Sequence, residues 1–315
     1  MPAVSVIVPA RDAAATLGRT LRGLEAQEGA PDLEVLVVDD GSTDATRDIA
    51  AASAVVAEVV AGGGEGPAHA RNAGAQRARG DVLAFLDSDC EPTPGWLAAG
   101  LAALEGADLV QGAVRPRPDA DLGPFDKTLW VTRAWGLFES ANLFLRRDLF
   151  DRLGGFESWL RPRNGIELGE DVWLGWRAHR AGARLAFAQE ALAWHEVFPR
   201  DARAYAAERA RLRYFPVMAA RIPELRERFF FRRVFLNRRS ALFDLAVAGA
   251  ALALARRSPL PLLAAIPYAR EVSRHSGRGN GGRPDPQIAA ADIAADTIGA
   301  AALLAGSLKA RTPLL

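Results

Sequence analysis

At 315 residues, half of them hydrophobic, the chain can form one large α/β domain or a domain with an appendage. Its single cysteine, Cys90, excludes an internal disulfide and a cysteine-rich zinc site, and it favours a reducing, cytoplasmic setting. The net charge of +1 conceals an asymmetry, because residues 200–239 carry twelve arginines against four acids, a surplus of eight positive charges.

The first half of the sequence alternates apolar runs with helical patterns. Strands are predicted over residues 4–8, 33–38, 55–60 and 82–86, with helices around 17–24, 44–52 and 68–78 and another after residue 96. Repeated strand–helix units predict an α/β fold with a mainly parallel sheet and helices on both faces. In such sheets ligands bind beyond the carboxyl ends of the strands.

Two pairs of aspartates follow the second and the fourth predicted strands. Asp87 and Asp89, one residue apart, can hold a hard divalent cation through oxygen ligands, with a diphosphate filling the remaining positions. The alternative is a surface turn, where Asp and Ser are common. Asp39 and Asp40 can hydrogen-bond a ribose or a base, or they can cap the next helix.

After residue 112 the pattern becomes less regular. Residues 115–124 form a proline-containing loop, and a strand over 142–145, a helix over 170–181 and a strand over 185–187 follow. The character changes again near residue 200. We therefore expect one domain over residues 1–200 and a basic, helical region over 201–315.

The basic region precedes three apolar runs, at residues 241–255, 259–269 and 288–308. The first two are shorter than the ~20 residues that span a bilayer, and the third contains Asp292 and Asp296, which make it a poor span. Basic residues beside apolar helices favour a monotopic attachment to an anionic lipid surface. A helical subdomain packed on the core and a two-pass anchor are the alternatives.

The most specific signal is the order of five segments: VSVIVPAR (4–11), VLVVDDGSTD (35–44), ARNAG (70–74), GDVLAFLDSD (80–89) and GEDVWLGWR (169–177). Over residues 4–196 the chain resembles the family 2 glycosyltransferases, which have the GT-A fold, a Rossmann-like α/β sheet. The resemblance implies that residues 1–200 bind a nucleotide sugar. It also implies inverting, metal-dependent transfer of the sugar to an acceptor hydroxyl, in cell-envelope, polysaccharide or glycolipid synthesis.

The resemblance also implies a donor pocket and a metal site. The donor-binding residues that it implies are Pro9, Ala10, Arg11, Asp39, Asp40, Arg71, Asp87 and Ser88. Asp87, Asp89 and His195 are the implied ligands of Mn²⁺ or Mg²⁺, and imidazole is a competent third ligand. Outside this motif context, Arg71 would be an arginine on a helix surface and His195 a hydrogen-bonded structural residue.

Asp171 matches the catalytic base of the family, with Glu170 as the alternative. Such a base must reach the proton of the acceptor hydroxyl and needs only a modestly raised pKa. Either carboxylate could instead complement the dipole at the start of a helix.

The implied donor carries uridine diphosphate by default, with guanosine and thymidine as alternatives, and the acceptor is an unknown hydroxyl that is lipid-linked if the chain contacts membrane. We expect a cytoplasmic protein, peripheral on the inner face of the cell membrane, with no nucleic-acid partner.

Two other functions fit the same residues. One is a nucleotidyltransferase, although residues 9–13 lack the glycine-rich, basic signature of that class. The other is a catalytically inactive sugar-nucleotide-binding or membrane-scaffold protein.

Overall fold

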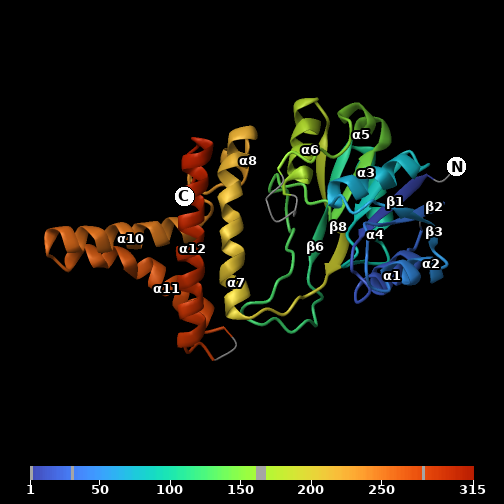
Figure 1. Cartoon of the computed structure of the whole chain (residues 1–315). Helices are drawn as coiled ribbons and strands as arrows, with labels where there is room; N and C mark the ends of the chain where they lie inside the picture. The colour runs from blue at the N-terminus through green and yellow to red at the C-terminus, as the bar shows by residue number, and fades with distance from the viewer. Residues whose placement is uncertain (1–2, 30–31, 161–167, 279–280) are drawn as a thin grey trace. The chain divides into compact units, whose positions relative to one another are not determined.

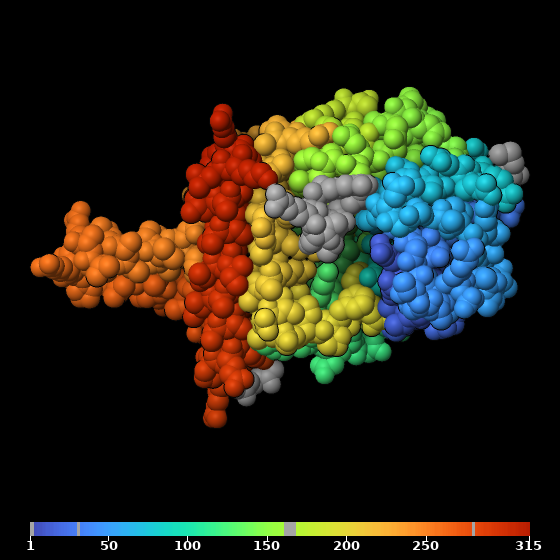
Figure 2. Space-filling model, viewed as in Figure 1, coloured from blue at the N-terminus to red at the C-terminus, as the bar shows by residue number. Residues whose placement is uncertain are grey.

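The computed structural model describes residues 3–29, 32–160, 168–278 and 281–315, drawn as a cartoon in Figure 1 and as a space-filling surface in Figure 2. The contacts divide the chain into two compact units. Unit 1 comprises Met1–Ala120 and Thr128–Val197, and unit 2 comprises Asp121–Lys127 and Phe198–Leu315.

Unit 1 contains a mixed sheet of eight strands in the order β3-β2-β1-β4-β7-β6-β8-β5. The strands are β1 (Val4–Ala10), β2 (Leu33–Asp39), β3 (Val56–Ala61), β4 (Val82–Leu86), β5 (Cys90–Pro92), β6 (Leu109–Arg115), β7 (Asn142–Arg146) and β8 (Leu185–His195). Strands β1 to β4 pair in parallel, as do β6 and β8, whereas β7 is antiparallel to β4 and β6. The predicted α/β sheet is confirmed, and its second half is more mixed than expected because β6 and β7 are joined without a crossover helix.

Helices flank the sheet of unit 1 (Figure 1). They are α1 (Leu17–Glu25), α2 (Thr46–Ala52), α3 (Pro67–Arg77), α4 (Trp96–Glu105), α5 (Arg147–Leu153) and α6 (Glu170–Arg180). The leucine spacing of α1 buries Leu17, Leu21 and Leu24 on one face. Helix α3 begins with a proline at its first position, where the missing N–H has no helical partner to lose.

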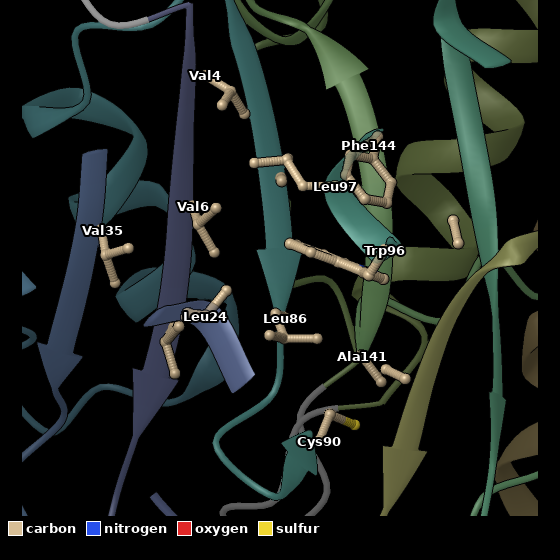
Figure 3. Packing of buried hydrophobic residues seen from close by; sticks show 14 of the residues in the cluster. Val4, Val6, Leu24, Val35, Leu86, Cys90, Trp96, Leu97, Ala141 and Phe144 are labelled. Atoms are coloured by element: carbon tan, nitrogen blue, oxygen red, sulfur yellow. The ribbon is translucent and has the colours of Figure 1, made fainter. Parts of the chain in front are cut away.

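The main hydrophobic core of unit 1 lies between the sheet and helices α1 and α4. Val4, Val6 and Val8 of β1 are fully buried, as expected of a central parallel strand covered on both faces. The rings of Trp96 and Phe144 pack with their centroids 4.8 Å apart (Figure 3). The core includes residues of β2 and β4, and the aspartate pairs follow the carboxyl ends of these two strands.

A buried asparagine joins three strands beneath those carboxyl ends. Asn142 Nδ2 donates to the carbonyls of Ala113 (2.9 Å) and Ala191 (2.7 Å), and Trp96 Nε1 donates to Asn142 Oδ1 at 2.8 Å. Gly112 leaves room for this amide, because a Cβ there would lie 2.3 Å from Asn142 Nδ2. The network therefore joins β6, β7 and β8 at the start of β7.

Unit 2 is helical. Its elements are α7 (Ala202–Glu208), η1 (Arg209–Tyr214), α8 (Phe215–Arg221), α9 (Leu225–Arg228), α10 (Arg238–Arg256), η2 (Leu260–Ala265), α11 (Ile266–Ser276) and α12 (Pro286–Ala310). A capping box starts α10, in which Asn237 Oδ1 accepts from Ser240 N and Ser240 Oγ accepts from Asn237 N. Asp285 caps α12 with its side chain alone, which accepts from Gln287 N and Ile288 N.

Helix α12 is long and apolar enough to cross a bilayer by length and composition, with a mean hydropathy of 1.6 over its most apolar window. Its two acids, however, are paired inside unit 2. Asp292 lies 3.0 Å from Arg239 and 2.7 Å from His275, and Asp296 accepts from Arg239 and from the Tyr268 hydroxyl, each at 2.8 Å. These polar contacts hold α10, α11 and α12 together.

Candidate active site

The Asp87-Ser88-Asp89 turn leaves the carboxyl end of β4 and is held from two sides. Asp87 N donates to the Ala141 carbonyl at 3.3 Å, and Cys90 N closes the turn on the Asp87 carbonyl at 3.0 Å. The hydroxyl of Thr20, on α1, donates to the Ser88 carbonyl at 3.0 Å. The two carboxylates are therefore presented by a fixed turn at the sheet edge.

A cavity of about 280 Å³ opens beside this turn. It is lined by Pro9, Ala10, Arg11, Asp40, Gly66, Pro67, Ala70, Arg71, Asp87, Ser88 and Asp89. The lining comes from the ends of β1, β2 and β4 and from the start of α3. Segments that are far apart in the sequence thus meet at one edge, as the strand order predicts.

Arg71 connects the two groups of carboxylates predicted from the sequence. Its buried guanidinium donates from Nη2 to Asp87 Oδ1 at 2.8 Å and from Nη1 to Glu170 Oε1 at 3.1 Å. Glu170 is itself buried, in the first turn of α6. Arg71 is therefore an interior cation of the site and not a surface arginine of α3.

Asp171 lies next to Glu170 in a carboxylate-rich environment. Its Oδ2 accepts a hydrogen bond from Ser140 N at 3.2 Å. Burial, together with the neighbouring charge of Glu170, raises the pKa of Asp171 well above its ordinary value, and Arg71 opposes this shift. Asp171 thus has the properties of a proton acceptor that works closer to neutral pH than a free carboxylate.

Glu139 is a third carboxylate near this pair, and its charge also raises the pKa of Asp171. Burial raises the pKa of Glu139 itself to about 7. Sequence reasoning missed this residue because a single glutamate at the end of an irregular segment carries no signal. Only the register of β7, whose first residue is Asn142, brings it here.

His195 and Asp89 meet because β5 pairs antiparallel with β8 and places Cys90 opposite His195. His195 Nε2 lies 3.6 Å from Asp89 Oδ2, and Nδ1 lies 2.6 Å from the Glu196 carbonyl. The tautomer that donates from Nδ1 to this carbonyl carries its lone pair at Nε2, the atom that faces Asp89.

Among the described residues, the ligand atoms of Asp89, Cys90 and His195 lie within 4.8 Å of one another. The thiol of Cys90 belongs to the hydrophobic core (Figure 3), and burial raises its pKa well above the ordinary value, so it stays protonated. Asp89 and His195 remain as the oxygen and nitrogen donors that fit a divalent cation, whereas Asp87 is engaged by Arg71.

The other aspartate pair has divided roles. Both oxygens of Asp40 accept from the glycine loop that precedes α3, from Gly64 N at 2.8 Å and from Gly66 N at 3.0 Å. Asp39 Oδ1 instead accepts from Ser42 N at 3.0 Å and closes the turn after β2. Asp40 therefore shapes the cavity wall, and the Asp39 side chain supports the turn behind it.

The cavity, the D-x-D turn and the acidic pair of Glu170 and Asp171 thus lie close together, and Arg71 contacts both acidic groups. Comparisons with known proteins identify the family. The profile described as "Glycosyl transferase family 2" matches residues 5–161. The glycosyltransferase AglE of Haloferax volcanii is 31% identical over 63% of this chain and 68% of its own length. The pre-mycofactocin glycosyltransferase of Mycobacterium tuberculosis is 30% identical, over 61% of this chain but only 42% of its own length.

A solved structure shares the fold over nearly the whole chain. The mannosyltransferase PcManGT from Pyrobaculum calidifontis, in complex with GDP-Man and Mn²⁺, superposes with a TM-score of 0.59 at 23% identity. The match covers 98% of this chain and 87% of that one. The chain belongs to glycosyl transferase family 2 and is a glycosyltransferase, which confirms the resemblance seen in its motifs.

Proposed function

We propose that the chain transfers a sugar from a nucleoside-diphosphate donor to an acceptor hydroxyl, with inversion at the sugar carbon and with the aid of Mn²⁺ or Mg²⁺. The observation that carries this proposal is the position of Arg71, whose guanidinium contacts Asp87 of the D-x-D turn and Glu170 of the acidic pair. Donor-side and base-side residues therefore share one site. A direct displacement needs both at once.

In this reaction the acceptor oxygen bonds to the anomeric carbon as the bond to the diphosphate oxygen breaks. The carboxylate of Asp171 takes the proton of the acceptor hydroxyl, and the electron pair of the broken bond leaves with the diphosphate. Asp171 suits this role better than Glu170, because Glu170 is committed to an ion pair with Arg71. Arg71 supplies positive charge beside the leaving group.

The residues around Asp89 fit a divalent cation. Asp89 and His195 would hold it, and hard cations such as Mg²⁺ and Mn²⁺ accept these donors. Asp87, whose Oδ1 accepts from Arg71, would offer its other carboxylate oxygen from the same turn. When bound, the cation supplies charge that stabilises a departing diphosphate.

The donor base is proposed to be uridine, with guanosine and thymidine as the alternatives to test. The acceptor is proposed to be a hydroxyl of a growing polysaccharide or glycoconjugate, and a lipid-linked one if unit 2 contacts a membrane. We further propose a cytoplasmic location at the inner surface of the cell membrane, supported by the arginine-rich segment before α10.

Calorimetric titration tests the donor site. The full chain is titrated with UDP, GDP and dTDP, with and without Mn²⁺, beside Asp89→Ala and the control Asp148→Ala, an exposed acid of α5. One diphosphate should bind with Mn²⁺, and Asp89→Ala should weaken that binding by about tenfold or more, while the control binds as the unmodified chain does. Binding that ignores both Mn²⁺ and Asp89 would overturn the assignment.

A product assay then tests the reaction. The sugar donor that shares the bound base is incubated with candidate acceptors, and the configuration of the new glycosidic bond is determined. Release of nucleoside diphosphate and an inverted linkage support the proposal. Release of pyrophosphate would indicate a nucleotidyltransferase, and a retained linkage would exclude the single displacement.

A further inference from the structure

Helix α10, η2 and α11 form a hairpin, residues 238–276, whose far end is apolar and exposed. The hairpin (orange) extends away from α12 (red) in Figure 2. Its base is packed, because Phe243, Tyr268 and Val272 form a buried cluster against residues of α12. Towards the tip, Gly249 lets the chain fold back on itself, since a Cβ there would lie 2.6 Å from the Pro261 carbonyl oxygen.

Large apolar side chains cover the outer part of this hairpin. Leu254 is 83% exposed, Leu260 72% and Leu263 62%. Other exposed members are Leu245, Val247, Leu252, Leu262 and Ile266. They come from both arms of the hairpin and from several sides of α10. A helix that docks in a groove of another protein needs only one apolar face, so this distribution does not suit that kind of partner. Apolar residues around most of a helix suit an apolar medium.

The charges of the hairpin indicate that this apolar medium is a lipid bilayer. Between residues 245 and 269 the only charged side chains are Arg256 and Arg257, at the turn between the two arms. Both are exposed, and no acid lies in the same interval. Leucines that flank two arginines can enter the boundary between head groups and acyl chains while the guanidinium groups reach the lipid phosphates.

We propose that the outer part of this hairpin, residues 245–266, is a monotopic anchor that inserts into the interface of a bilayer containing anionic phospholipid. The proposal rests on the membrane location given under the proposed function and assigns it to one element. It differs from a transmembrane role for α12, whose acids Asp292 and Asp296 are paired within unit 2.

Vesicle flotation with the full chain tests the anchor. The probes are phosphatidylcholine vesicles and vesicles in which about one third of the lipid is phosphatidylglycerol. The unmodified chain should float with the anionic vesicles and bind them about tenfold or more tightly than the neutral ones. Leu254→Asp/Leu263→Asp should abolish flotation, and Arg256→Ser/Arg257→Ser should remove the preference for anionic lipid.

The matched control is Leu122→Asp/Leu308→Asp, two exposed leucines of unit 2 outside the hairpin, and it should float like the unmodified chain. Loss of flotation in this control alone would place the membrane contact outside the hairpin and overturn the proposal. An unmodified chain that ignores both vesicles would overturn the membrane location as well. If light scattering then finds a dimer for the unmodified chain and a monomer for the hairpin variant, the hairpin contacts a second copy of the chain and not a membrane.

Nucleotide binding separates this proposal from the donor chemistry. All these variants should bind the nucleoside diphosphate with Mn²⁺ as the unmodified chain does, because the substituted residues lie in unit 2 and the cavity residues in unit 1. Intact nucleotide binding also shows that the catalytic unit has folded. A loss of flotation then reports on the hairpin and not on misfolding of unit 1.

Discussion

Arg71 Nη2 donates a 2.8 Å hydrogen bond to Asp87 Oδ1, so an interior arginine of α3 pairs with the first acid of the D-x-D turn. The same guanidinium contacts Glu170, and it is 5% exposed. This buried cation is a structural requirement as well as a feature of the site, because removing it leaves the buried charge of Glu170 without a partner.

Replacement of Arg71 by methionine should therefore lower the free energy of unfolding by about 3 kcal/mol, since it leaves Glu170 buried without its partner. Urea denaturation measures this change. The control Arg77→Met, in an exposed pair with Glu58, should change stability by less than about 0.5 kcal/mol. Equal stability of Arg71→Met and the unmodified chain would show that Arg71 does not balance these acids.

His195→Asn should weaken Mn²⁺-dependent nucleotide binding by about tenfold or more, because it removes the imidazole nitrogen that faces Asp89. Titration of Mn²⁺ at a fixed nucleotide concentration measures the effect. His179→Asn, at an exposed position of α6, serves as the control and should leave the Mn²⁺ dependence unchanged. An unchanged Mn²⁺ affinity in His195→Asn would reduce His195 to a structural role.

If Asp171 is the base, as proposed, the rate of transfer should rise with pH as Asp171 loses its proton, because a base acts in its charged form. The pKa of Asp171 is raised by burial and by Glu170, and Glu139 adds to the shift, so the acidic limb lies above the range of a free aspartate. Asp171→Asn should abolish transfer and leave nucleotide binding intact.

Glu139→Gln removes one of the negative charges that raise the pKa of Asp171, so it should move the acidic limb of the rate profile to lower pH. The measurement is the pH dependence of kcat/KM. Glu190→Gln, at an exposed position of β8, is the control and should not move it. A limb that stays in place would mean that Glu139 does not act on the base.

Glu139 should also make stability depend on pH. Its pKa is about 7 in the folded chain against 4.5 for the free group, so the folded chain holds the proton more tightly. The resulting stabilisation is present below about pH 4.5 and is lost as the pH rises to about 7, by up to roughly 3 kcal/mol. Glu139→Gln should not show this loss. The free energy of unfolding of Glu139→Gln, measured in urea, should therefore exceed that of the unmodified chain by more at pH 8 than at pH 5.

Cys90 should resist thiol reagents in the native chain. It is fully buried in the core and its pKa is raised by burial and by Asp89 and Asp87, so little thiolate forms at pH 8. Ellman's reagent should react with one thiol per chain in denaturant and only slowly without it. Rapid labelling of the folded chain would show that the thiol is not confined to the core.

Much of the cavity lining could be predicted from sequence because its residues follow predicted strands directly. Asp40 and the Asp87-Ser88-Asp89 turn come at the ends of apolar strands, and parallel strands place their carboxyl ends at one edge of a sheet. The family motifs then separated these acids from ordinary turn residues. Asp39 shows the limit of this reasoning, since adjacent residues at a strand end point in different directions.

The sequence by itself determined the α/β class, the family and the edge of the sheet that carries the cavity, because these depend on local periodicity and on motifs of contiguous residues. The tertiary structure alone decided the pairing of Arg71 with Asp87 and Glu170, the approach of His195 to Asp89 and the position of Glu139. The contact of His195 and the position of Glu139 depend on the antiparallel register of β5 and β7, and the Arg71 contacts join α3 to α6. Pairing over such long sequence separations leaves no local pattern in the chain.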